Sequence, residues 1–351
     1  MRESVVLDAP SWDSRGEYVA VLIGSGGSFH LKVFRRSQEG FSEDGHYLVP
    51  WEQVGPAHFP LQPVSEPQWL NPDEVLLRVG TKSSAQKRVG GVVLWNFRQN
   101  KSRVIVPQAT FYQVAPNGKS IIFCDAALSP SVMHLETGRQ IPIQVPKDFR
   151  PRCFFYWSNS GNRVAFQSTL ATMPGIKPAR SPGSYILIAH IGQKDVTLTD
   201  LWFQELQRGY NAYGVGWFNE ETILFGVSER QLKPGQFVMN PPTRFVLYKV
   251  AVGGSPKVPQ KVWEADPKVS PSGGPLFWLE QGGFAYPLGR EGRDYAIYLP
   301  KEKRLQQLRF PEPTWAYSVS PKGDMLLAVN QAQKKVYAAV VSTRRVLPLP
   351  V

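Results

Sequence analysis

The sequence predicts an all-β protein: a seven-bladed β-propeller of four-stranded antiparallel blades in a single domain. The apolar segments are short, rich in Val, Ile, Phe and Tyr, and separated by Gly, Pro, Asn and Ser, which is typical of strands. One short phrase recurs along the chain at intervals of roughly 40 to 60 residues, a length that suits a four-stranded blade. Helical periodicity is almost missing, and the best helix candidate is residues 199–208.

The recurring phrase is an aromatic or apolar residue, a polar turn of about three residues, and then a β-rich strand. Its copies begin at Trp12, Trp69, Val114, Trp157, Trp217, Trp278 and Val319. A further strand follows each copy, so the predicted blades are approximately residues 5–62, 63–107, 108–148, 149–208, 209–268, 269–311 and 312–351. We expect the tryptophans at the phrase starts to pack between neighbouring blades.

The chain ends are predicted to meet. Val5, Val6 and Leu7 suit the inner strand of the first blade, and residues 346–349 suit the outer strand of the seventh. Closure without strand exchange leaves side-chain packing to hold these two blades together. Removal of residues 346–351 is therefore expected to destabilise the protein.

Two copies of the phrase, residues 157–161 (Trp-Ser-Asn-Ser-Gly) and 319–323 (Val-Ser-Pro-Lys-Gly), resemble the Trp-Ser-Pro-Asp-Gly repeats of TolB-like and WD-repeat-like β-propellers. The resemblance covers nearly the whole chain and implies the propeller fold. Such repeats serve binding proteins, peptidase gating domains and a few lyases, so they indicate no single function. Pro-Asp is replaced in several copies, and the boundaries of the fifth and sixth blades rest on periodicity alone.

Charge gives the main indication of a partner. Forty Lys and Arg against 28 Asp and Glu leave a net charge of +12, which favours anionic partners. In a propeller, the loops between second and third strands share one face. The basic residues predicted there are Lys82, Lys87, Arg88, Lys177, Arg180, Arg230, Lys233, Arg290, Arg293, Lys334 and Lys335. We expect a protein or anionic polymer to bind this face at one end of the central channel, the alternative being solvated charge that serves solubility. The opposite face also carries bases, including Arg344.

Aromatic residues are predicted near the channel. Tyr112, Tyr213, Trp315 and Tyr317 are candidates for stacking on nucleic-acid bases, although such residues are commonly packing residues. No helix-turn-helix or zinc-finger spacing is present, so any nucleic-acid binding is expected to be non-specific.

The sequence contains no complete set of catalytic residues. Its five histidines are scattered without metal-site spacing, and it lacks a Gly-x-Ser-x-Gly elbow and a phosphate-binding loop. A loop-borne metal or general-base site is conceivable in residues 41–64, which contain Asp44, His46 and His58. We expect no cofactor, no metal and a non-catalytic protein. The alternative is a lyase or hydrolase acting on an anionic saccharide, and two or more histidines with a carboxylate at the channel mouth would favour it.

Cys124 and Cys153 lie in apolar strand-like segments and are expected to be buried free thiols. The chain has neither an N-terminal apolar stretch nor an uncharged run of the roughly 18 to 20 residues that a membrane helix needs. These features predict a soluble, cytoplasmic monomer without a membrane span.

Overall fold

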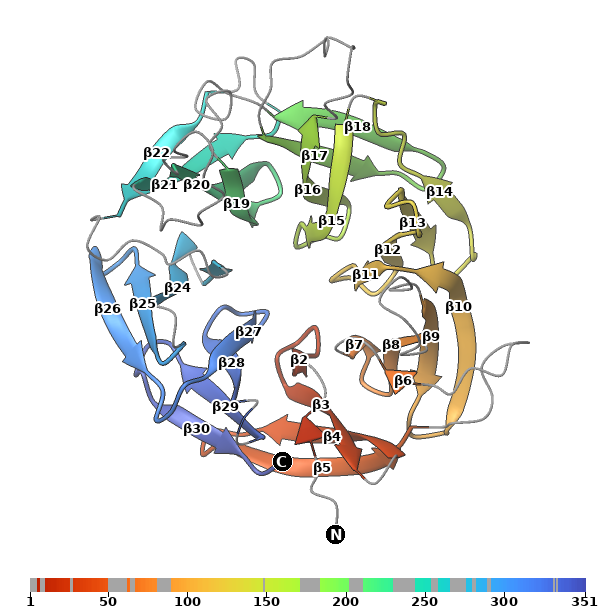
Figure 1. Ribbon diagram of the computed structural model, residues 1–351, viewed down its shortest axis with the longest axis vertical. Helices are drawn as coiled ribbons and strands as arrows, with labels where there is room; N and C mark the ends of the chain where they lie inside the picture. The colour runs from red at the N-terminus through yellow and green to blue at the C-terminus, as the bar shows by residue number, and fades with distance from the viewer. Residues whose placement is uncertain are drawn as a thin grey trace, which may run out of the picture. The chain divides into compact units, whose positions relative to one another are not determined.

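The computed structural model describes residues 5–6, 10–25, 28–49, 62–63, 67–80, 90–147, 149–170, 184–201, 211–229, 244–253, 258–265, 276–279, 282–288, 292–330, 332 and 334–351. These residues form strands and turns with no α-helix. The strands make seven separate antiparallel sheets, which are the seven blades of a β-propeller (Figure 1). The predicted fold class is therefore confirmed.

Each blade is a consecutive stretch of the chain. The first three blades contain β1 (Val5–Val6), β2 (Ser11–Trp12), β3 (Tyr18–Ser25), β4 (Ser28–Arg36) and β5 (Phe41–Leu48); β6 (Gln62–Pro63), β7 (Gln68–Asn71), β8 (Glu74–Gly80), β9 (Gly90–Asn96) and β10 (Lys101–Ala109); and β11 (Phe111–Val114), β12 (Ser120–Cys124), β13 (Pro130–His134) and β14 (Gln140–Pro142).

The remaining four blades follow in the same order. They contain β15 (Phe149–Trp157), β16 (Arg163–Leu170), β17 (Ser184–Ile191) and β18 (Val196–Leu201); β19 (Asn211–Asn219), β20 (Thr222–Glu229), β21 (Arg244–Ala251) and β22 (Gln260–Glu264); β23 (Phe277–Trp278), β24 (Phe284–Leu288), β25 (Asp294–Leu299) and β26 (Arg304–Arg309); and β27 (Trp315–Val319), β28 (Met325–Asn330), β29 (Lys335–Val340) and β30 (Val346–Leu349).

The first two blades have an interrupted first strand. β1 pairs with β3 at Gly24 and Ile23, and β2 pairs with the same edge of β3 at Ala20 and Val19. β6 and β7 share one edge of β8 in the same way. Both sheets therefore contain five strands in four strand positions, and Val5–Val6 takes part in the inner position predicted for it.

The recurring phrase forms the turn between the first and second strands of a blade. In three copies its second residue is a buried Asp13, Ser158 or Ser320, whose side-chain oxygen accepts backbone hydrogen bonds from the strand that follows. In the copy at Ser320, the N–H of Gly323 donates to the Ser320 carbonyl, and Gly323 has a φ of 71°. Since a positive φ favours glycine, the polar residue and the glycine together explain why the phrase recurs.

The chain forms two compact units. The first contains Met1–Val114, Trp278–Phe284 and Glu291–Val351, and the second contains Ala115–Phe277 and Ala285–Arg290. In the second unit, the fourth and fifth blades share an apolar cluster, and the indole N–H of Trp217 donates to the Tyr156 carbonyl at 2.7 Å. In the first unit, Trp69 donates to the Ser11 carbonyl at 3.2 Å. These contacts confirm the predicted packing role for these two tryptophans.

The first and seventh blades meet within the first unit without exchanging a strand, as predicted. Their side chains form one buried cluster, in which Trp12 and Phe34 pack with Leu327, Val336 and Leu349. Beside this cluster, Arg36 forms a two-pronged ion pair with Asp324, with a closest distance of 2.6 Å. Among the described residues, side-chain packing and side-chain hydrogen bonds, including one from Ser318 to the Pro10 carbonyl, hold the two blades together.

The structure corrects one expectation from the sequence in part and one in full. Residues 199–201 of the helix candidate belong to β18, where pairing with β17 overrides local propensity, and residues 202–208 lie outside the described residues. Cys124 and Cys153 are not free thiols: they form a disulfide between β12 and β15. Adjacent blades bring together two cysteines that are 29 residues apart in the sequence.

The described residues contain no helix that is long and apolar enough to pass through a lipid bilayer.

Candidate functional site

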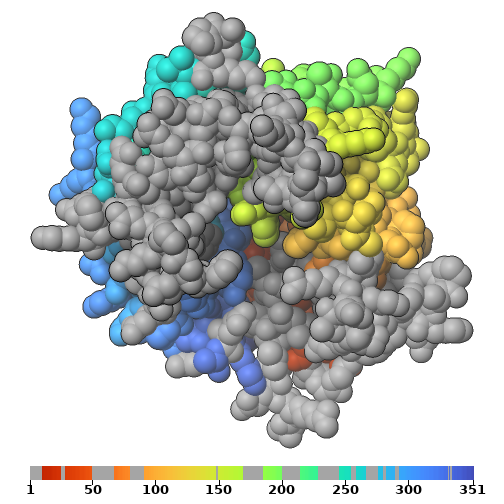
Figure 2. Space-filling view, turned by 45° about the horizontal axis from the view of Figure 1, so that its top comes forward, coloured from red at the N-terminus to blue at the C-terminus, as the bar shows by residue number. Residues whose placement is uncertain are grey.

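Most of the predicted basic face lies outside the described residues. Figure 2 shows the described residues in colour. The predicted residues outside the described part are Lys82, Lys87, Arg88, Lys177, Arg180, Arg230, Lys233 and Arg290. Arg293, Lys334 and Lys335 are described, and all three belong to the sixth and seventh blades. A site that uses these three predicted residues must therefore be sought at the sixth and seventh blades.

A groove of about 600 Å³ runs between β26 and β30 within the first unit. It brings together two of the predicted residues, Arg293 and Lys335, which lie in different blades. Arg309, at the end of β26, and Arg344, in the turn before β30, complete its cationic lining. Its apolar lining consists of Phe310, Pro311, Tyr337, Val346 and Pro348. We call this site the basic groove.

Polar contacts hold the four cations of the basic groove in place. Arg309 makes a two-pronged ion pair with Asp294, at 2.7 and 3.0 Å, and Lys335 lies 3.5 Å from Glu312. Arg293 donates to the carbonyls of Phe310 and Pro311, and Arg344 donates to the amide oxygen of Gln306; these acceptors are uncharged. Among the described residues that line or contact the groove, four cations face two carboxylates, which leaves a positive excess there.

The pKa values of two groups reflect this environment. Hydrogen bonds from Arg309 lower the pKa of the Asp294 carboxyl, so this group stays ionised well into the acidic range. Burial, the hydrogen bond to Glu312 and the charge of that carboxylate together raise the pKa of Tyr337 to about 12. Tyr337 is therefore a neutral donor to Glu312 at neutral pH.

Sequence reasoning missed Arg309, and it assigned Arg344 to the opposite face from Lys335. Lys335 begins β29, and Arg344 follows the end of that strand, so the two residues do lie at opposite ends of one strand. The groove runs along the strand and contains both. No local sequence signal marks Arg309, the last residue of β26, as a neighbour of Lys335, because only the packing of adjacent blades decides which basic residues meet.

The predicted aromatic residues have different surroundings. Tyr112 is buried, and its hydroxyl donates to the Leu76 carbonyl at 2.8 Å, so its ring is not available for stacking on a base. Trp315 and Tyr317, on β27, are 40% and 36% exposed. Tyr213 lies in β19, and its side chain is outside the described residues.

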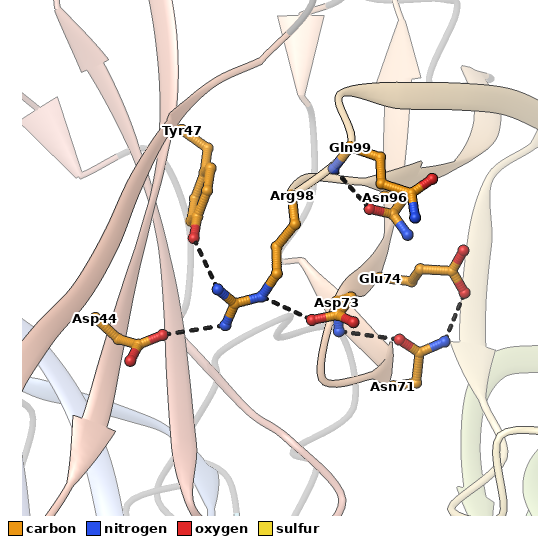
Figure 3. A network of polar contacts seen from close by, with 8 residues as sticks. All are labelled: Asp44, Tyr47, Asn71, Asp73, Glu74, Asn96, Arg98 and Gln99. Atoms are coloured by element: carbon orange, nitrogen blue, oxygen red, sulfur yellow. Dashed lines mark hydrogen bonds and ion pairs between the residues drawn. The ribbon is translucent and has the colours of Figure 1, made fainter.

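A second polar cluster lies between the first and second blades (Figure 3). Arg98 donates to Asp73 at 2.7 Å, to Asp44 at 3.2 Å and to the Tyr47 hydroxyl at 3.4 Å. Here one cation faces two carboxylates, so the cluster has no positive excess. Asp44 was a possible metal ligand in the sequence analysis. In the structure it forms an ion pair with Arg98 between the first and second blades.

The structure places two histidines side by side. His30 on β4 and His46 on β5 have ring centroids 4.8 Å apart, and partial burial together with the nearby His46 lowers the pKa of His30. Both lie on the third and fourth strands of the first blade rather than on the first strand, where a channel-mouth site is expected. Within the described residues, no group of three or more His, Cys, Asp or Glu side chains is suited to hold a metal ion. His58 lies outside the described residues.

Comparisons with known proteins support the fold and no particular activity. No family model and no curated protein sequence matches the chain. Similar solved structures include a puromycin-hydrolysing peptidase of Mycobacterium tuberculosis, with a TM-score of 0.61 and 16% identity over 98% of this chain and 52% of the peptidase. The tricorn protease has a TM-score of 0.62 and 12% identity over 99% of this chain and 35% of the protease.

An oligogalacturonate lyase in complex with manganese has a TM-score of 0.54 and 11% identity over 98% of this chain and 84% of the lyase. The chain thus spans about half of the peptidase and about a third of the tricorn protease, at 52% and 35% of their lengths. At such low identities the similarity establishes a β-propeller fold that these enzymes also contain.

Proposed function

We propose that this propeller is a non-catalytic binding platform that engages an anionic partner, either a protein or a polymer, through the basic groove. One observation carries the proposal: Arg293 and Lys335, predicted from the sequence as partner-binding residues in two blades, line the same groove with Arg309 and Arg344. Cations gathered along a concave, partly apolar wall focus the electric field on an approaching anion. A solubility charge does not require such convergence.

The pattern of ion pairing supports the same function. A structural cluster such as that of Arg98 balances its cation with carboxylates. In the basic groove, the guanidinium groups of Arg293 and Arg344 donate to uncharged oxygens. The charge of Arg344 is therefore available to a ligand, and that of Arg293 is offset in part by the nearby Asp294. Pre-positioned guanidinium groups bind carboxylates and phosphates at a small entropic cost.

Binding of the full chain to a panel of polyanions at two salt concentrations tests this proposal. The panel contains single-stranded DNA, RNA, an anionic polysaccharide and an acidic polypeptide. The double variant Lys335→Gln/Arg344→Gln should weaken binding of the preferred ligand by roughly tenfold or more, and the salt dependence should become shallower.

The matched control is Lys101→Gln/Arg103→Gln, which removes the same charge from exposed positions on β10 of the first unit. Equal loss of binding in the two variants would contradict a specific site and indicate that the basic residues of the groove serve solubility. Depolymerisation of the polysaccharide during the assay would instead favour the enzyme alternative.

The compartment and the oligomeric state are separate proposals. Structural disulfides persist mainly in oxidising compartments, so the Cys124–Cys153 bond supports such a compartment over the cytoplasm expected from the sequence. Alkylation of the protein from its native cells without prior reduction should leave both cysteines unmodified, whereas two alkyl adducts would support the cytoplasm. We keep the proposal of a monomer, which sedimentation analysis tests.

A further inference from the structure

We propose that the basic groove binds an extended acidic peptide whose two anionic ends flank a short aliphatic segment. This inference rests on the proposed function and names the class of partner. It follows from three properties of the groove: the distance between its cations, the chemistry of its floor, and the character of the β30 edge.

The separation of the cations excludes a small anion as the complete ligand. Lys335 begins β29, and Arg344 lies beyond the other end of this strand, which is six residues long. At about 3.3 Å per residue, the two positions are roughly 17 to 20 Å apart. A phosphate or a single carboxylate contacts one end of the groove, whereas an extended peptide of about six to eight residues reaches both.

The floor favours aliphatic side chains over nucleic-acid bases. The groove contains the rings of Phe310 and Tyr337, but they are 0% and 6% exposed and therefore offer no open face for stacking. The accessible apolar lining is formed by Pro311, Val346 and Pro348. Base stacking on aromatic side chains is a main source of affinity for single-stranded nucleic acids, and this floor does not provide it.

The charged ends suit carboxylates. At one end lie Arg293, Arg309 and Lys335, with Asp294 and Glu312 behind them; at the other end lies Arg344, held by Gln306. The positive excess is thus divided between two ends with an uncharged middle. A nucleic acid or a regular polysaccharide carries its charge at every repeat, whereas a peptide can place acidic residues at its ends and aliphatic residues between them.

The edge of the seventh blade is poorly suited to binding a peptide as an added strand. β30 is the last strand of its sheet, but it contains Pro348, which has no N–H to donate. Recognition therefore depends on side chains of the ligand: carboxylates at the two ends and aliphatic groups over Val346 and Pro348. This binding mode predicts that affinity depends on the order of the side chains in the peptide and not on hydrogen bonds from its backbone.

Fluorescence polarisation of the full chain with a labelled peptide, Glu-Glu-Leu-Val-Pro-Leu-Glu-Glu, tests the inference. Lys335→Gln and Arg344→Gln should each weaken binding about fivefold, because each removes one ion pair at a different end. Val346→Asp should abolish detectable binding by placing a carboxylate on the floor. Circular dichroism and thermal unfolding establish whether each variant is folded.

Two control peptides and one control variant complete the experiment. The same residues arranged with all four glutamates at one end should bind at least roughly fivefold more weakly, since the cations at the two ends are not engaged together. A peptide with N-methylated central amides should keep its affinity, because no strand is added. Lys101→Gln should have no effect.

The outcomes separate this inference from the proposed function. Equal affinity for the ordered and rearranged peptides, or tighter groove-dependent binding of DNA or polysaccharide, would overturn the acidic-peptide inference and leave an anion-binding platform intact. If no ligand in either experiment depends on Lys335 or Arg344, both proposals are wrong.

Discussion

The two faces of the seventh blade are made from the same strands and behave differently. On the face towards the first blade, Leu327, Val336 and Leu349 are buried in a continuous apolar cluster. On the face towards the sixth blade, Lys335, Tyr337 and Pro348 line the basic groove. Adjacent residues on β29 and on β30 thus serve opposite faces, as the alternation of side chains along a strand requires.

The difference shows that the junction between two neighbouring blades can be closed at its outer edge by apolar packing or can be open there as a groove. Both junctions have a packed inner part. Phe34 and Leu327 belong to the cluster with the first blade, and on the other side the buried Tyr295 hydroxyl of the sixth blade accepts a hydrogen bond from the Ala316 N–H of the seventh at 2.8 Å. At the junction with the first blade, Arg36 is neutralised by Asp324, whereas the junction with the sixth blade has four cations along its rim. The closed junction is suited to stability, and the open one to binding.

Loss of β30 should have the largest effect, because it removes the outer strand from both faces at once. We expect deletion of residues 346–351 to cost about 5 kcal/mol or more, since Leu349 leaves the cluster and the β29–β30 ladder is lost. Urea unfolding followed by tryptophan fluorescence measures this change. Deletion of residues 350–351 alone is the control, and an equal effect of the two deletions would show that the cluster does not depend on β30.

The next largest effect is the difference in stability between substitutions on the two faces of β30. Leu349→Ala should cost about 2–4 kcal/mol because it opens a cavity in the cluster, whereas Val346→Ala, at the partly exposed groove, should cost less than about 1 kcal/mol. Urea unfolding of the two variants measures the difference. Similar losses would mean that the groove side is packed as tightly as the cluster side.

The ion pair beside the cluster should have a smaller, pH-dependent effect. Although partial burial by itself raises the pKa of Asp324, hydrogen bonds from Arg36 and Ser320 lower it below its usual value. The stabilisation is therefore present above about pH 4, the pKa range of an unfolded aspartate, and is lost as the pH falls through the lower folded value. Asp324→Asn should cost about 1–2 kcal/mol at pH 7 and reduce the acid sensitivity of unfolding.

Urea unfolding curves recorded over a series of pH values test whether this stabilisation is lost as the pH falls. Glu17→Gln is the control, because the Arg15–Glu17 pair lies on the surface of the same blade as Arg36. An acid sensitivity that stays the same in Asp324→Asn and in the unchanged protein would contradict a role for the pair in joining the blades.

The smallest effect is expected at the groove. Glu312→Gln removes a carboxylate that raises the pKa of Tyr337, so this pKa should fall from about 12 while staying above the usual value, because burial remains. Ultraviolet difference titration against Tyr337→Phe measures it. Anion affinity should rise roughly twofold through the reduced negative charge, and a decrease would show that Glu312 positions Lys335 rather than neutralising it.

Local chemistry made much of the fold predictable. In copies such as residues 12–16 and 319–323, the polar residue and the glycine of the turn act within a few residues of one another, so such copies identify hairpins wherever they occur. Short β-rich segments at blade-length spacing then predict the sheets. Residues 199–201 of the helix candidate form the end of β18 instead, because pairing with β17, a tertiary contact, outweighs local propensity.

The sequence by itself therefore determined the blade repeat, the strand order and the excess of basic charge, because each of these depends on residue type and local spacing. Only the tertiary structure decided which distant residues meet. The packing of adjacent blades brings Cys124 to Cys153. Arg309 and Arg344 line the same groove as Arg293 and Lys335 because the sixth and seventh blades are neighbours (Figure 1). Contacts between blades depend on shape and packing across long stretches of chain, which local spacing does not encode.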